Sequence, residues 1–91
     1  MKKQLLTVTL LMGTFVASAQ VGVGTLNPNK SAQLDVVADD KGILIPRVSL
    51  TSVTDNTTIT NGNVESLLVF NLTNNEFLSQ GYYYWFNGEW R

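Results

Sequence analysis

The sequence predicts a small all-β module of short antiparallel strands and hairpins, with an extended N-terminal arm and a core that is completed by oligomerisation. Short apolar and aromatic runs alternate with clusters of Gly, Asn, Asp, Ser and Thr, the pattern of strands joined by turns. The chain of 91 residues contains no Cys and no His. Disulfides and the usual structural zinc site therefore cannot supplement a small core. Oligomerisation, or continuation of the domain in a partner chain, is the remaining ordinary solution.

The N-terminal segment has the three parts of a secretion signal. Lys2 and Lys3 form a basic region, residues 5–16 form an apolar region, and Ala17-Ser18-Ala19 is a small-x-small cleavage site. The apolar run is shorter than the roughly 18–20 residues of a membrane-spanning helix, so we prefer a cleaved signal to a membrane anchor. We expect export to the extracellular space or cell surface, with the periplasm as the alternative. The mature chain then begins at Gln20 and spans no membrane.

We divide the chain into a signal peptide (1–19), an extended N-terminal arm (20–32) and a small β-rich module (33–91). The arm begins QVGVGTLNPN, where two glycines and one proline favour an extended piece and a turn over a helix. At the start of the module, Leu34 and Val36 alternate with more polar neighbours. This alternation predicts a half-buried strand.

Three further elements are expected in the module. The run Gly42–Leu50 is rich in β-branched residues, but Pro46 lacks a backbone donor, so the run suits an edge strand or a kinked strand. Residues 51–62 are mostly Thr, Asn, Asp and Ser, which indicates a long polar surface loop. The runs 66–71 and 81–86 are predicted strands, one aliphatic and one aromatic.

Asn87-Gly88 is the strongest short hairpin signal in the chain, because both central positions of a type I′ turn require positive φ. Such a turn would clamp the end of the chain with an aromatic pair and a cation–π contact. Its register pairs Phe86 with Glu89, Trp85 with Trp90 and Tyr84 with Arg91.

The order and spacing of five short motifs resemble a widespread family of secreted Bacteroidota proteins. The motifs are VGVGT (21–25), NPNKSAQLDV (27–36), KGILIPRVSLT (41–51), SLLVFN (66–71) and GYYYWFNGEW (81–90). The family pattern is VGIGT-x-P-x-SA-LDV, KG-LLPRM-T, GLLVYN and YYYDG-W, and the resemblance covers essentially the whole mature chain. It implies the head of a longer surface or tail-fibre-like protein, with a structural or adhesive role and no catalytic residue. Because no fibre shaft follows Arg91, we expect a truncated gene, a free-standing module or one subunit of a larger assembly.

The residue types present exclude most catalytic and nucleic-acid-binding functions. Without His and Cys, Ser–His–Asp and Cys–His catalysis have no residues to use. Lys30 and Ser31 are adjacent in an expected loop without a supporting group, which argues against Ser–Lys chemistry. Asp35, Asp39 and Asp40 lack the spacing of a calcium loop, so a solvated turn is favoured over a metal site. The mature chain is mildly acidic, which offers no basic surface for nucleic acid.

The aromatic C-terminal strand is the one constellation with functional potential. Alternate side chains of a strand point to opposite faces, so one aromatic face packs inward and the other remains available. Our candidate residues for a subunit interface or a glycan-stacking platform are Tyr83, Trp85 and Trp90, with a core or interface role favoured over glycan binding.

We therefore expect a non-enzymatic structural or interaction module of a bacterial surface or extracellular, fibre-like assembly. Its expected partners are copies of itself, as a trimer if the fibre resemblance holds, or other secreted surface proteins. The alternative is a glycan-binding adhesin or lectin-like module. No cofactor, metal or catalytic residue is expected.

Overall fold

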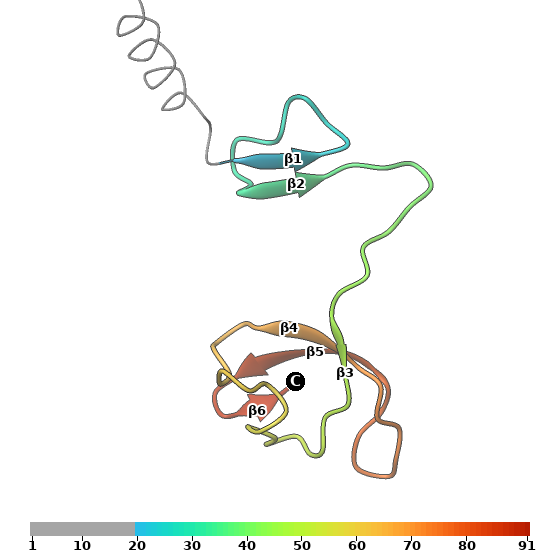
Figure 1. Cartoon of the computed structure of the whole chain (residues 1–91), viewed down its shortest axis with the longest axis vertical. Helices are drawn as coiled ribbons and strands as arrows, with labels where there is room; N and C mark the ends of the chain where they lie inside the picture. Colours follow the sequence, from blue (N-terminus) through green and yellow to red (C-terminus); the bar gives the residue numbers. More distant parts are fainter. Residues whose placement is uncertain (1–19) are drawn as a thin grey trace, which may run out of the picture. The chain divides into compact units, whose positions relative to one another are not determined.

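The structure, a computed structural model, describes residues 20–91. The predicted secretion signal lies outside the described residues. The described part of the chain contains six short strands and no helix (Figure 1), which confirms the all-β fold class. It separates into two compact units, one that reaches Gly42 and one formed by Ile43–Arg91.

The N-terminal unit is built on two parallel strands, β1 (Val21–Val23) and β2 (Leu34–Val36). Beyond the strand ends, the Val21 amide donates to the carbonyl of Gln33 and the Val37 amide to that of Val23, both at 2.8 Å. The predicted N-terminal arm thus contributes a paired strand. The compact unit reaches Gly42.

The C-terminal unit contains a four-stranded sheet in the order β3-β4-β5-β6. The antiparallel part runs from β4 (Leu68–Asn71) through β5 (Gly81–Phe86) to β6 (Glu89–Trp90). Strand β3 (Arg47–Val48) lies parallel to β4, a pairing that the sequence pattern did not predict.

Pro46 explains the position of β3. The strand begins directly after Pro46 and occupies the edge of the sheet, as predicted from the missing backbone donor. The proline carbonyl still takes part in the pairing, since it accepts a hydrogen bond from the Phe70 amide at 3.0 Å.

The C-terminal hairpin has the predicted turn and register. Asn87 and Gly88 have φ of 52° and 81°, as a type I′ turn requires. Trp85 lies opposite Trp90, with ring centroids 5.2 Å apart in an edge-on arrangement. The backbones of Tyr84 and Arg91 exchange two hydrogen bonds of 2.9 Å.

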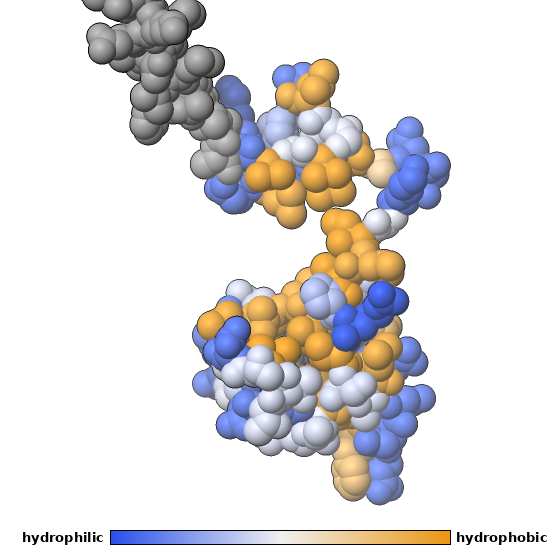
Figure 2. All heavy atoms as spheres, viewed as in Figure 1, coloured by the Kyte–Doolittle hydropathy of each residue, from blue (hydrophilic) through white to orange (hydrophobic). Residues whose placement is uncertain are grey.

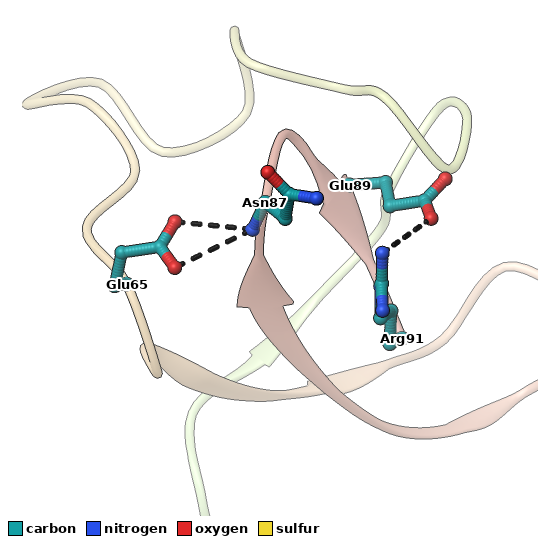
Figure 3. A network of polar contacts seen from close by, with 4 residues as sticks. All are labelled: Glu65, Asn87, Glu89 and Arg91. Carbon is teal, nitrogen blue, oxygen red and sulfur yellow. Dashed lines mark hydrogen bonds and ion pairs between the residues drawn. The ribbon is translucent and has the colours of Figure 1, made fainter.

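Contacts around the chain end support this hairpin (Figure 3). The guanidinium of Arg91 lies 5.3 Å from the ring centroid of Phe86. It also approaches Glu89 to 3.0 Å. The cation–π partner of Arg91 is therefore Phe86. Tyr84, which lies directly opposite Arg91, is the preceding residue on the same face of β5. On the other side of the turn, Glu65 accepts a hydrogen bond from the Asn87 amide at 3.1 Å.

Gly88→Val should destabilise the protein by about 1–3 kcal/mol, because a β-branched residue is strained at positive φ. No atom lies within 4 Å of a Cβ built at Gly88, so the cost comes from the backbone conformation and not from a clash. Gly42→Val is the matched control, since that site is equally open and has no positive φ. Thermal melts at equal protein concentration check the prediction. Equal melting temperatures for the two variants would contradict it.

The hydrophobic core of the C-terminal unit is small. In the described part of the chain, the fully buried hydrophobic residues are Leu50, Val69, Leu78 and Trp90. Half-buried side chains pack around them: Val48, Ile59, Leu67, Tyr83 and Trp85.

Two buried polar side chains hold the loops against this core. Asn71, at the end of β4, is fully buried and uses all of its hydrogen-bonding capacity. Its carbonyl oxygen accepts from the amides of Leu50 and Thr73, and its amide group donates to the carbonyls of Thr73 and Ser79. Because Leu50 follows β3 and Ser79 precedes β5, Asn71 joins the chain entering the polar loop to the chain entering β5.

Asp55 likewise holds the polar loop of residues 51–62 in place through hydrogen bonds. The segment is a loop, as predicted. The carboxylate of Asp55, however, is buried, and its hydrogen bonds fix the conformation of the loop. Five hydrogen bonds reach the carboxylate, from the Thr51 amide and from the amides and hydroxyls of Thr57 and Thr58.

Candidate subunit interfaces

The N-terminal unit leaves one apolar sheet face uncovered. In the register of β1 and β2, Val21 lies beside Leu34 and Val23 beside Val36, so the four side chains share a face. They are between 39% and 57% exposed. Figure 2 shows apolar surface gathered on this unit. The predicted half-burial of Leu34 and Val36 is thus wrong within the chain itself, because the residue on the opposite face, Asp35, is the less exposed one.

This uncovered face is physically unusual. Parallel sheets occur almost only where both faces are covered. A two-stranded sheet is marginally stable by itself in water. A pair of three-residue parallel strands with four exposed aliphatic side chains therefore calls for further packing.

The C-terminal sheet carries a second uncovered face, which is aromatic. Tyr82, Tyr84 and Phe86 alternate along β5 on its outer side and are 58%, 46% and 47% exposed. Neighbouring strand β4 adds Leu68 opposite Tyr84 and Phe70 opposite Tyr82, the latter pair in edge-on ring contact at 5.0 Å. Contiguous exposed apolar patches of this kind mark interaction surfaces.

The three residues predicted from the sequence lie on the other face of the sheet. Tyr83 and Trp85 are half buried against the core, and Trp90 is 3% exposed. The Trp90 indole N–H donates to the carbonyl of Asp55 at 2.8 Å, and the Tyr83 hydroxyl donates to that of Ser79 at 3.0 Å. Tyr83, Trp85 and Trp90 therefore occupy the core side of the sheet, and a direct interface or glycan-stacking role for them stays a prediction.

The hairpin register itself indicates which face of the sheet is buried. It places Arg91 beside Tyr84 and Trp90 beside Trp85. A charged residue marks the side that faces solvent, while the pairing of two tryptophans marks the side that is most favourable to bury.

The described residues offer no constellation for metal chemistry. Between residues 20 and 91 no group of three or more His, Cys, Asp or Glu side chains is placed to hold a metal ion. Asp35 instead accepts a hydrogen bond from the Asn29 amide at 2.7 Å. No helix within this range is long and apolar enough to cross a membrane.

A small all-β chain with a minimal core and two uncovered apolar faces belongs to the class of modules that associate with other chains. Comparison with known families identifies which kind of association module this chain is. The chain matches the phage tail like trimerisation region over residues 22–91, and it belongs to this family. No curated protein and no solved structure matches it.

Membership in this family defines the general role of the chain. It is a structural, fibre-like module that associates with copies of itself. The match reaches into both compact units, so the aromatic face of β5 and all of the uncovered β1–β2 face except Val21 lie within the trimerisation region. A trimerisation region of a tail-like assembly points to an extracellular or surface setting and to a non-enzymatic role.

Proposed function

We propose that the chain is exported by its N-terminal signal and trimerises as a module of a bacterial surface or extracellular fibre. The family match over residues 22–91 carries this proposal. The structure adds a physical reason for association, because few hydrophobic side chains are buried in the described part of the chain while two apolar faces are left open. Other secreted surface proteins are further partners that the aromatic face of β5 would suit.

Expression of the whole chain in an exporting bacterium tests both parts of the proposal. We expect an exported protein whose intact mass corresponds to a chain beginning at Gln20, and whose light-scattering mass is three times that of the protomer. Its melting temperature should rise with protein concentration, because association stabilises the folded state by mass action. Retention of the signal would refute export. A monodisperse monomer with a concentration-independent melt would refute trimerisation.

A second candidate function is glycan binding by the aromatic face of β5. The observation that favours it is the row formed by Tyr82, Tyr84 and Phe86, since exposed aromatic rings can stack on sugar rings. Titration of the trimer with soluble polysaccharide, followed by calorimetry, tests this function. Saturable binding that Tyr84→Ser abolishes without changing the oligomer mass would support an adhesin or lectin-like role.

A further inference from the structure

The two faces of the β1–β2 sheet differ in how much of each is covered. One face is covered by the loop that connects the strands: the Asn29 amide bonds to Asp35, and the Gln20 side-chain amide bonds to the carbonyls of Asn29 and Ala32. A Cβ built at Gly22 would lie only 2.6 Å from Cγ of Pro28, which shows how closely this loop approaches the strand. The connecting loop therefore covers this face within a single copy.

Within residues 20–42, the opposite face has no such cover. It presents the side chains of Val21, Val23, Leu34 and Val36, which are all aliphatic and uncharged. It offers no aromatic ring for a sugar to stack on and no cation for a phosphate group. Its chemistry is best matched by another aliphatic surface.

We propose that the β1–β2 sheets of three copies pack together through this face around a common axis. The inference rests on the proposed trimerisation and identifies a surface that forms the trimer. An uncharged aliphatic face is complementary to a second copy of itself, because burial against a copy leaves no charge unpaired. Three equivalent faces that meet at one axis also form a closed assembly, the usual arrangement in soluble homo-oligomers. Each parallel strand pair then acquires the second covering layer that its fold requires.

Leu34→Asp in the whole exported chain is the principal test. It places a charge at the centre of the proposed contact, and we expect the light-scattering mass to fall from that of the trimer to that of the protomer at micromolar concentration. Leu26→Asp is the matched control, because it makes the same change in the same unit at a side chain that is 98% exposed on the covering loop. This control should remain trimeric. Near-ultraviolet circular dichroism of the Trp85–Trp90 pair reports whether the C-terminal unit is folded in each variant.

A cross-linking measurement keeps the proposal testable if Leu34→Asp fails to fold. The chain has no Cys of its own, so Val23→Cys supplies a single reactive thiol. Around a common axis these thiols lie close together, and a short bismaleimide should join two copies in high yield. Leu26→Cys is the control and should give at least tenfold less product.

The outcomes separate this inference from the proposed function. A monomeric wild-type chain would refute trimerisation itself. A trimeric wild type whose Leu34→Asp variant stays trimeric, or whose Val23→Cys variant does not cross-link above the Leu26→Cys control, would overturn the assignment of this face alone. Loss of the trimer in Leu34→Asp together with efficient cross-linking through Val23→Cys would establish it.

Discussion

Asp55→Ala is expected to lower the free energy of unfolding by about 3 kcal/mol, since it removes several hydrogen bonds between part-buried donors and a charged acceptor, each worth about 1.5–3 kcal/mol at most. The carboxylate accepts hydrogen bonds from Thr51, Thr57 and Thr58, and the side chain is 5% exposed. Small domains are stable by only about 5–15 kcal/mol, so the variant should lose a large fraction of its stability. Asn56→Ala, at an exposed neighbour in the same loop, should change the stability by less than about 0.5 kcal/mol. Urea unfolding of both variants at one protein concentration measures the difference.

The same carboxylate makes stability depend on pH. Burial raises the pKa of Asp55, but the hydrogen bonds from Thr58, Thr51 and Thr57 outweigh it and hold the pKa well below its ordinary value. The unfolded chain therefore takes up this proton at a higher pH than the folded chain does. The contribution of Asp55 is complete above the ordinary pKa of an aspartate, about 3.9, and is lost as the pH falls through the lower folded value.

Asp55→Asn isolates this effect, because it keeps the shape of the side chain and removes the titration. Its amide nitrogen must face backbone N–H groups on one side, so the variant should be less stable than the wild type at pH 7. The difference in unfolding free energy between the two proteins should then shrink as the pH is lowered from 5 toward 2. A difference that is constant over this range would show that the ionised form of Asp55 is not what stabilises the loop.

Trp90→Ala is expected to cost about 3–5 kcal/mol, the range for removing a large aromatic side chain from a core. The indole of Trp90 packs edge-on against Trp85 and donates its N–H to the carbonyl of Asp55, so the change removes both a core contact and a tie to the polar loop. Trp90→Phe keeps an aromatic ring and should cost less, chiefly one lost hydrogen bond of about 0.5–1.5 kcal/mol, because the Asp55 carbonyl keeps its hydrogen bond from Asn63. Phe77→Ala is the control, since Phe77 is 80% exposed.

Thermal melts at a fixed protomer concentration rank these variants, because association makes the melting temperature concentration-dependent. Trp90→Ala combined with Gly88→Val should lose less than the sum of the two single losses, since both changes act on one hairpin. Full additivity, or a Trp90→Ala variant as stable as Phe77→Ala, would show that the hairpin does not serve to place Trp90 in the core.

The features that could be predicted from the sequence depend on short-range chemistry. The type I′ turn at Asn87 and Gly88 depends on two residues that tolerate positive φ, and the register of the hairpin follows directly from the turn. The edge position of β3 follows from the missing donor of Pro46. Both properties belong to a few adjacent residues, so they can be read without knowledge of the rest of the fold.

Which face of each strand is covered depends on tertiary contacts. Alternation predicts that Tyr83 and Tyr84 point to opposite sides, but the choice of the Tyr83 side for the core depends on packing with residues such as Leu50, which is distant in sequence. In the sequence, Asp55 looks like any other polar loop residue. It is buried because the loop folds around its carboxylate and because the Trp90 indole binds its backbone carbonyl. The exposed Val23 and Leu34 face likewise depends on the parallel pairing of two strands and on a loop that covers their other side. Such pairings join segments far apart in the chain, and local pattern carries no information about which segments will meet.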